Sequence, residues 1–187
     1  MRKVIMINRI SMDGFFAGPN GEMDWFIHDP EVDSAVHGKE QGDVLIFGST
    51  TYREFDSFWP HIASDPNASK EFRALADELT QMTKVVFSTT LKENDLTWKN
   101  TKLFDGNLAE VVRNLKNEDG TDILIFGSGT IVQQLASEGL IDEYMFVVTP
   151  IVLGTGKPLF KDVHKFNLKL LRTMSFNSGN VLLHYAI

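Results

Sequence analysis

Two segments of the chain combine glycine and small hydroxyl residues directly after an apolar run. Gly48, Ser49, Thr50 and Thr51 follow the run at 44–47, and Gly127, Ser128, Gly129, Thr130 and Ile131 follow the run at 123–126. Where a buried strand leads through such residues into a helix, unpaired N–H groups and the positive end of the helix dipole point outward, which suits a phosphate or pyrophosphate. A tight turn with a Ser or Thr cap and no ligand is the alternative. Two such junctions in one chain favour a nucleotide.

The glycine spacing differs from the common nucleotide and hydrolase motifs. A Rossmann fingerprint needs a third glycine where this chain has Val132, and a Walker loop fails at 154–157 because the upstream glycine is missing and Pro158 follows. Ser128 lacks the glycine spacing of a nucleophile elbow. The chain has no cysteine and five scattered histidines, so we expect no metal site.

A glycine-rich segment and an acidic cluster lie upstream of both junctions. Residues 11–25 join three glycines to several aromatic side chains, a composition typical of a lid that closes over a flat ring. An ordinary loop that packs its aromatic side chains into the core is the alternative. The acidic cluster contains Asp24, Asp29, Glu31 and Asp33, and its position favours a solvated helix start over a binding site.

The elements that hold these residues follow from apolar spacing. Five continuous apolar runs predict strands buried on both faces of a largely parallel sheet. They lie at 4–7, 44–47, 85–87, 123–126 and 145–148. Three stripes of helical spacing predict helices at 72–79, 108–115 and 130–139, the second capped by Asn107 and the third ended by Gly139. We expect a surface loop over most of 56–68 and an antiparallel hairpin at 167–187.

Composition predicts one globular α/β domain over 1–187. Of the 187 residues 43% are apolar, enough for a sizeable core, and 18 Lys and Arg against 25 Asp and Glu give a net charge of −7. This charge disfavours binding to nucleic acid or to an anionic membrane surface. Asn8, Arg9 and Asp13 interrupt the apolar start before it could serve as a signal peptide. We therefore expect a cytoplasmic protein with neither nucleic acid nor membrane as a partner.

Four motifs, in this order, resemble the dihydrofolate reductase superfamily. They are Ser11-Met12-Asp13-Gly14, Gly48-Ser49-Thr50-Thr51-Tyr52, Phe126-Gly127-Ser128-Gly129, and the run from Gly139-Leu140-Ile141-Asp142-Glu143 through Thr149-Pro150 to Gly154-Thr155-Gly156. Within it, the chain is most similar to the branch with the carboxy-terminal reductase domain of the riboflavin-biosynthesis deaminase/reductase, RibD. The resemblance implies a three-layer α/β fold with a central, mostly parallel mixed sheet, helices on both faces and a C-terminal antiparallel hairpin.

The resemblance also implies a reaction and the residues that serve it. The reaction is hydride transfer from NADPH to a small pyrimidine-like or pterin-like substrate under the lid, in a homodimer. The two glycine junctions would cradle the cofactor pyrophosphate, and Ser88, Thr89 and Thr90 would lie by its adenosine end. The implied substrate contacts are Asp13, Trp25, Tyr52 and Thr149. Asp13 would steer the proton in catalysis, with Asp29 as the second candidate.

Two positions depart from the pattern of these relatives. Ser49 and Thr130 stand where relatives often carry an Arg that can pair with the 2′-phosphate of the cofactor, so NADH stays open beside NADPH. A cis peptide often found in the cofactor turn of the family would fall here between Gly127 and Ser128. A true dihydrofolate reductase and a non-catalytic protein that binds nicotinamide nucleotides are the alternative functions.

Overall fold

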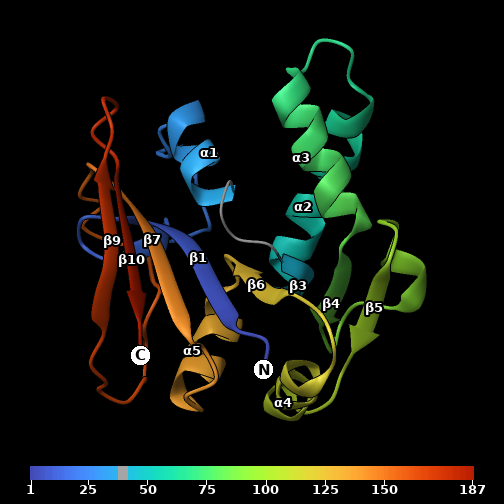
Figure 1. The fold of residues 1–187 in the computed structure, drawn as a ribbon. Coiled ribbons are helices and arrows are strands. Elements are labelled where there is room, and N and C mark those ends of the chain that lie inside the picture. Colours follow the sequence, from blue (N-terminus) through green and yellow to red (C-terminus); the bar gives the residue numbers. More distant parts are fainter. Residues whose placement is uncertain (38–41) are drawn as a thin grey trace.

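The computed structural model describes residues 1–37 and 42–187 as an eight-stranded sheet with helices on both faces (Figure 1). In spatial order its strands are β5 (Thr101–Phe104), β4 (Thr83–Phe87), β3 (Gly42–Gly48), β6 (Asp122–Phe126), β1 (Val4–Ser11), β7 (Glu143–Thr149), β10 (Val181–Ala186) and β9 (Lys169–Ser175). Two short strands, β2 (Phe15–Ala17) and β8 (Lys157–Pro158), form a separate antiparallel pair. The helices are α1 (Pro30–His37), α2 (Ser49–Ser64), α3 (Lys70–Gln81), α4 (Leu108–Asn117) and α5 (Gly129–Ser137), with a 3-10 turn at Glu93–Asp95.

The strand directions confirm the predicted fold class. The strands from β5 to β7 are parallel, and all five predicted apolar runs lie among them. Strand β10 runs antiparallel to β7 and to β9, and the turn between β9 and β10 contains Gly179 at a φ of +85°. This confirms the C-terminal hairpin. Within the described ranges, no helix is both long enough and apolar enough to cross a bilayer.

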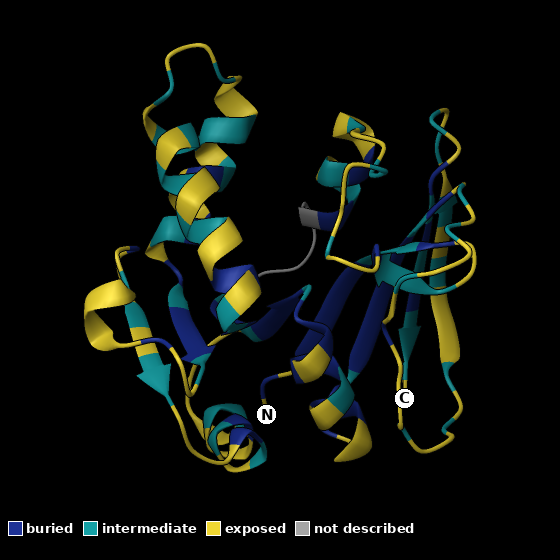
Figure 2. Ribbon diagram, turned by 180° about the vertical axis from the view of Figure 1, so that it is seen from behind, coloured by how far each residue is buried: buried dark blue, intermediate teal, exposed yellow. Residues whose placement is uncertain are grey.

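Two hydrophobic cores lie on opposite faces of the sheet, because successive side chains of a strand point to opposite sides. In β3, Val44 and Ile46 belong to one core, whereas Leu45 and Phe47 belong to the other. Helices α4 and α5 close the first core, and α1, α2 and α3 close the second. Figure 2 shows the buried central strands between helices whose outer faces are exposed.

Side-chain caps and left-handed residues set the helix ends where the sequence predicts them. The Asn107 side chain accepts a hydrogen bond from the Glu110 N–H at 3.2 Å, at the start of α4. Helix α5 ends just before Gly139, which has a φ of +63°. The predicted helix at 72–79 corresponds to α3, where the Ser69 hydroxyl accepts from the Phe72 N–H at 3.1 Å.

The loop predicted over most of 56–68 was wrong, because α2 continues through Pro60 to Ser64. A proline inside a helix removes one N–H donor and disfavours the turn before it. Here aromatic packing offsets that cost. The ring centroids of Phe55 and Trp59 lie 6.1 Å apart, and Trp59 lies 5.3 Å from Phe72 of α3. The tertiary contact with α3 therefore overrides the local signal of Pro60.

Candidate functional site

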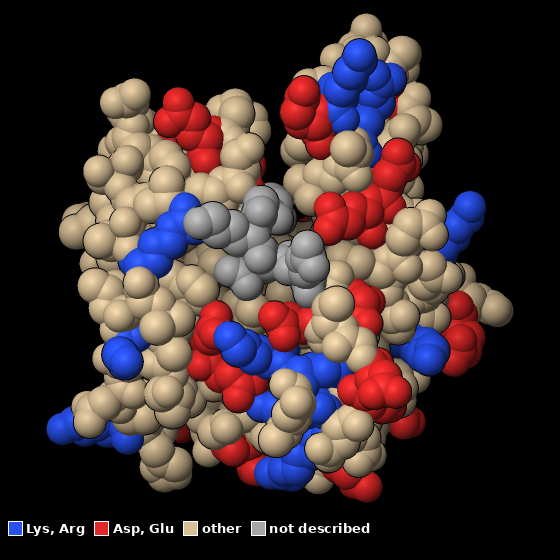
Figure 3. Space-filling model, in the orientation of Figure 1, with Lys and Arg blue, Asp and Glu red and all other residues tan. Residues whose placement is uncertain are grey.

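A cavity of about 680 Å³ lies at the carboxyl ends of β1, β3 and β6. Its walls come from segment 11–25, called the lid below after its predicted role, from α1, from the facing sides of α2 and α3, and from the start of α5. Figure 3 shows the molecule hollowed between α1 and the α2–α3 pair. Strand β6 lies between β3 and β1, and the helices that follow β3 and β6 cover opposite faces of the sheet. A ligand crevice is expected at such a point in an open α/β sheet.

The two glycine junctions meet in this cavity and are bonded to each other. The Ser128 hydroxyl accepts a hydrogen bond from the Gly48 N–H at 2.8 Å, and the Ser128 N–H donates to the Thr51 hydroxyl at 3.1 Å. The junction residues that line the cavity are Gly48, Ser49, Thr50, Thr51, Gly127, Ser128, Gly129 and Thr130. The structure therefore joins two segments that are 80 residues apart in sequence.

The N-termini of α2 and α5 have no side-chain cap among the described residues. Gly48, the N-cap of α2, has no side chain that could cap the helix, and the side chain of Ser128, the N-cap of α5, does not bond to its own helix. The hydroxyl groups at these junctions bond across to the other junction instead. The first-turn N–H groups of both helices are thus available to an anionic ligand, together with the positive ends of two helix dipoles. This contradicts the alternative of two self-capped turns.

The turn into α5 has an unusual backbone that brings the lid close. Gly127 and Ser128 both have left-handed φ values, +61° and +55°, and the peptide bond between them is trans. A Cβ atom on Gly129 would lie 2.5 Å from the ring of Phe16, which belongs to β2 in the lid. Only glycine at position 129 therefore allows the lid ring to rest on the start of α5.

Asp13 fastens the lid to the segment before β8. Its carboxylate accepts hydrogen bonds from the N–H groups of Leu153 at 3.1 Å and Gly154 at 2.7 Å, and from the Ser11 hydroxyl at 2.7 Å. The Ser11 hydrogen bond, followed by those from the backbone, lowers the pKa of Asp13 below its ordinary value. Asp13 is exposed and does not line the cavity, so its geometry is that of an anchor.

An ion-pair cluster forms the α1 wall of the cavity. The Arg9 guanidinium donates to the Asp33 carboxylate at 2.6 Å and lies over the Phe26 ring, with 5.9 Å from Cζ to the centroid. His28 Nδ1 lies 3.3 Å from the other oxygen of Asp33. Sequence reasoning treated Asp33 only as part of a helix start. Its partner Arg9 lies 24 residues away, on another element, and no local spacing signals that pair.

Glu54 of α2 and Lys157 of β8 add two more charged side chains to the walls. The protein around the Glu54 carboxyl group displaces water and raises its pKa above the ordinary value, while the positive charge of Lys157 acts in the opposite direction. Neither residue was singled out as a site residue from the sequence. No local spacing in the sequence brings these two residues together, because they lie on α2 and β8, more than 100 positions apart.

Asn8 of β1 presents a buried polar group to the cavity. Its exposed fraction is 3%, and its amide oxygen has no hydrogen-bond partner among the described residues. Buried polar atoms in proteins are nearly always paired, so an unpaired one on a cavity wall indicates a bond completed by a ligand or water. A ligand donor such as a carboxamide N–H would satisfy it.

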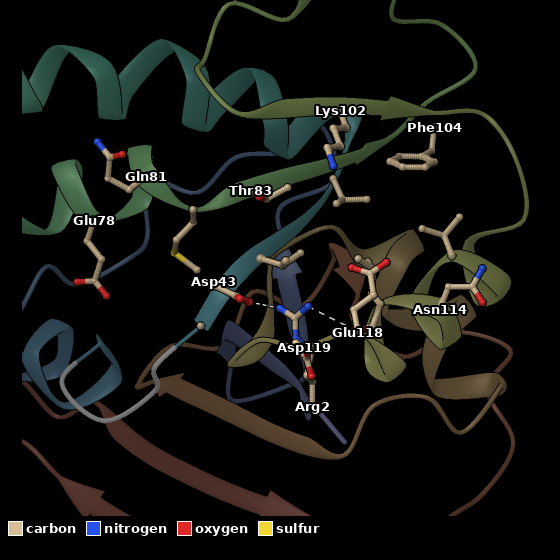
Figure 4. A pocket seen from close by; sticks show the side chains of 16 residues that line it. Arg2, Asp43, Glu78, Gln81, Thr83, Lys102, Phe104, Asn114, Glu118 and Asp119 are labelled. Carbon is tan, nitrogen blue, oxygen red and sulfur yellow. Dashed lines mark hydrogen bonds and ion pairs between the residues drawn. The ribbon is translucent and has the colours of Figure 1, made fainter.

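A second cavity, of about 820 Å³, lies at the opposite end of the strands (Figure 4). The Arg2 guanidinium points between Asp43 and Glu118, pairs with Asp43 and donates to the Thr121 carbonyl at 2.6 Å. These contacts tie the N-terminal residues to the start of β3 and to the loop before β6. Ligand sites of open α/β sheets lie at the carboxyl ends of the strands, so this cavity at the amino ends is structural in character.

Comparison with known proteins identifies the family of this chain. The model of the RibD C-terminal domain family matches residues 2–182. This chain belongs to the RibD C-terminal domain family. It is 35% identical to the uncharacterized protein YyaP of Bacillus subtilis (strain 168) over 186 residues, which is 98% of this chain and 94% of YyaP. The family expected from the four motifs is therefore confirmed.

Solved structures show the same fold. RibD of Acinetobacter baumannii superposes with a TM-score of 0.71 at 21% identity, covering 100% of this chain and 58% of that chain. Dihydrofolate reductase of Enterococcus faecalis, complexed with NADP(H), superposes with a TM-score of 0.64 at 14% identity, covering 98% of this chain and 95% of that chain. The RibD-family fold and its likeness to dihydrofolate reductase are thus shown.

Several residues predicted for the site lie in the core of this RibD-family domain. Tyr52 is fully buried, and its hydroxyl accepts a hydrogen bond from the Trp98 N–H at 3.3 Å. Thr149 is fully buried, and its hydroxyl has no hydrogen-bond partner among the described residues, while Ile131 is 5% exposed. None of the three lines the cavity. Tyr52 and Ile131 lie one residue beyond a lining residue, on the side of the helix that faces the sheet.

Other predicted residues lie near the surface of the RibD-family domain. Trp25 donates its indole N–H to the Glu22 carbonyl at 3.1 Å, within the lid. Asp29 accepts a hydrogen bond from the Ser178 hydroxyl, which lowers the pKa of Asp29. Ser88, at the end of β4, accepts from the N–H groups of Thr90 and Leu91. Neither these residues nor Thr89 line the cavity. Their roles toward substrate and adenosine stay predictions.

Proposed function

We propose that this protein is an NADPH-dependent reductase that transfers a hydride to a pyrimidine-like or pterin-like substrate. Its reaction type would be that of 5-amino-6-(5-phosphoribosylamino)uracil reductase. One observation carries the proposal: two uncapped helix N-termini, joined by the bond between Gly48 and Ser128, open on the same cavity as the unpartnered amide oxygen of Asn8. Membership of the RibD C-terminal domain family supports it.

The residues present fit a nicotinamide nucleotide. The first-turn N–H groups of α2 and α5 would hold the pyrophosphate, and this backbone binding suits a protein whose own net charge is −7. The Asn8 amide oxygen, which has no partner among the described residues, can accept from a carboxamide. When bound, the reduced nicotinamide supplies the hydride. The chain contributes orientation, and its lid excludes water.

Proton delivery would fall to the carboxyl groups on the cavity wall. Reduction of a carbon–nitrogen double bond adds the hydride to carbon and a proton to nitrogen. Glu54 lines the cavity, and its raised pKa keeps a larger protonated fraction at a given pH than an ordinary glutamate has. Asp13 and Asp29 are engaged outside the cavity, so we assign them to holding the lid and the loop before α1.

We also propose that the protein is a cytoplasmic homodimer. Edge strand β9 exposes Leu170 and Leu171, with exposed fractions of 50% and 48%, on a sheet edge where a second copy could pack. Sedimentation velocity would give a dimer that dissociates on replacement of both leucines by serine. A monomer at all concentrations would remove this proposal.

Titration with reduced cofactor is the test of the proposed function. We expect saturable quenching of protein fluorescence by NADPH, followed by substrate-dependent loss of NADPH absorbance. The substrates are 5-amino-6-(5-phosphoribosylamino)uracil, dihydrofolate and unphosphorylated analogues. Turnover of dihydrofolate that is blocked by antifolates would favour a dihydrofolate reductase. Binding of NADPH without hydride transfer to any of them would favour a non-catalytic binding protein, and the absence of binding would refute the proposal.

The chain also offers a test of cofactor choice. Ser49 lines the cavity at the start of α2, where an Arg could pair bidentately with a 2′-phosphate. Ser49→Arg should raise the preference for NADPH over NADH by about tenfold, on the order of one charge-assisted contact. Ser49→Gln is the matched control, because it adds length without charge. An equal effect of both variants would show that charge is not what matters there.

A further inference from the structure

The outer wall of the cavity consists of contacting aromatic and aliphatic side chains. We call these residues the aromatic wall: Phe55, Phe58 and Trp59 on α2, with Phe72 and Leu75 on α3. Trp59 lies 5.3 Å from both Phe58 and Phe72, measured between ring centroids. Phe58 is 47% exposed. Phe55, Trp59 and Leu75 pack on the core with one side and line the cavity with the other. Apolar surface left open in this way marks a binding surface.

The aromatic wall continues inward to the cofactor end of the cavity. Phe55 lies 5.9 Å from Phe126, which ends β6 and also lines the cavity, and 5.0 Å from Phe47 of β3. Figure 1 shows α2 and α3 extending beyond the strand ends to which these inner rings belong. A ligand whose reacting part lies at the glycine junctions can therefore extend along the wall without leaving apolar surface.

The charges on the cavity walls are balanced. Within 1–37 and 42–187, the lining residues include two permanent cations, Arg9 and Lys157, and two carboxylates, Asp33 and Glu54. Arg9 is paired with Asp33. The charge of Lys157 opposes the rise in the pKa of Glu54 and contributes to the lowered pKa of Glu22. The helix N-termini are taken by the cofactor in the proposed function. A phosphate ester on the substrate would meet one cation that is already paired with Asp33 and the Glu54 carboxyl group near the other, which disfavours it.

We infer that the substrate carries an uncharged apolar substituent, preferably aromatic, that stacks on the aromatic wall, in place of a phosphorylated sugar. This inference rests on the proposed function and narrows its substrate class. The substituent would be attached to the flat ring of the substrate, because the wall begins where the cofactor site ends. Stacking and burial of apolar area supply its affinity.

A matched ligand pair tests this inference. One aminopyrimidine ring is prepared with a benzylamino substituent and with a 5-phosphoribosylamino substituent, and calorimetry gives both dissociation constants with and without NADPH. We expect the benzylamino compound to bind about tenfold more tightly or better, on the order of one buried aromatic group. Tighter binding of the phosphoribosylamino compound would overturn the inference.

Variants of the wall locate the effect. Trp59→Ala should weaken binding of the benzylamino compound by about tenfold or more and leave the dissociation constant for NADPH unchanged. Phe160→Ala is the matched control, since Phe160 is 40% exposed but lies outside the cavity. Phe58→Lys adds a cation at an exposed position and should shift the preference toward the phosphoribosylamino compound. This second variant keeps the test decisive if Trp59→Ala does not fold.

The outcomes separate this inference from the proposed function. Absence of NADPH binding would remove the proposed function, while the ligand pair can still be compared on the protein alone. Normal NADPH binding with equal affinity for both compounds would leave the proposed function standing and overturn the inference. A change in sedimentation on Trp59→Ala or Phe58→Lys, with unchanged ligand affinity, would show that a second copy of the chain covers the aromatic wall and would overturn it as well.

Discussion

Replacement of Ser128 by alanine removes the bond that holds the two glycine junctions together. The Ser128 side chain is the acceptor for the Gly48 N–H at 2.8 Å, and Ser128 is 7% exposed. A donor left without its partner costs about 1–3 kcal/mol when water cannot reach it. Because Gly48 lines the cavity and is only partly buried, we expect the lower half of that range, about 1–2 kcal/mol, as the loss in free energy of unfolding.

Comparison of Ser128→Gly with Ser128→Ala separates the energy of the lost hydrogen bond from the energy of backbone strain. Serine and alanine suffer similarly at the φ of +55°, whereas glycine adopts it without the left-handed penalty of about 1 kcal/mol. Both variants lose the hydroxyl. We therefore expect Ser128→Gly to be about 1 kcal/mol more stable than Ser128→Ala, although both bind NADPH several-fold more weakly than the natural protein does.

Urea denaturation and NADPH titration of the natural protein, Ser128→Ala and Ser128→Gly test whether this hydrogen bond holds the two junctions in place. The unfolding midpoint and slope give the free energy of unfolding, and fluorescence quenching gives the dissociation constant for NADPH. If Ser128→Ala stays within about 0.3 kcal/mol of the natural protein and binds NADPH equally well, the junctions hold their positions without this bond. The reasoning that links Ser128 to the geometry of both helix N-termini would then be refuted.

Three further variants test the core, the lid anchor and the lid contact. Burial lowers the pKa of Lys84 from 10.5 to about 8. Between these pH values Lys84 is protonated in the unfolded chain but not in the folded protein. The free energy of unfolding should therefore rise with pH across this range, by up to about 3 kcal/mol. Lys84→Met should abolish this rise in urea midpoints measured across that pH range, and parallel curves for the two proteins would contradict it. Asp13→Asn removes the negative charge that accepts from the Gly154 N–H, so hydrogen exchange in 11–25 should become faster while exchange in β6 stays constant; unchanged exchange in the lid would show that Asp13 is no anchor. Gly129→Ala places a Cβ 2.5 Å from the Phe16 ring, so it should lower the melting temperature and weaken NADPH binding. The stability loss should be smaller in the background of Phe16→Ala, and additive effects in that double-mutant cycle would exclude the contact as its cause.

Local patterns in the chain were sufficient to predict most strands of the sheet and the start of α4. The apolar run at 44–47 predicted β3 because a strand covered on both faces needs apolar side chains at every position, and Asn107 predicted the start of α4 because its side chain can accept from a first-turn N–H. The turn around Gly179 followed from the same kind of local rule. Strand β5 was missed, since its four residues, Thr101–Phe104, form too short a pattern for periodicity to identify.

Contacts between distant residues determined the walls of the site. The Arg9–Asp33 pair, the position of Glu54 and the apolar face of α2 around Trp59 depend on how α1 and α2 pack against the sheet. The sequence marked Asp13 as a polar residue after β1, but its carboxylate bonds to the backbone N–H of Gly154, 141 positions away. Spacing rules describe neighbours along a strand or helix, and they contain no information about such partners.

By itself, the sequence determined the family, the fold class and the two glycine junctions, because each depends on residue types at short, fixed spacing. The tertiary structure alone decided that the hydroxyl of Ser128 bonds to the Gly48 backbone of the other junction, and that both helix N-termini are left uncapped. A hydroxyl group can accept a hydrogen bond from an N–H group of its own helix or from one of a neighbouring segment, at similar distance and energy. Only the packing of β3 beside β6 places the Gly48 N–H within reach of the Ser128 hydroxyl. The resulting hydrogen bond joins the two turns in one candidate site.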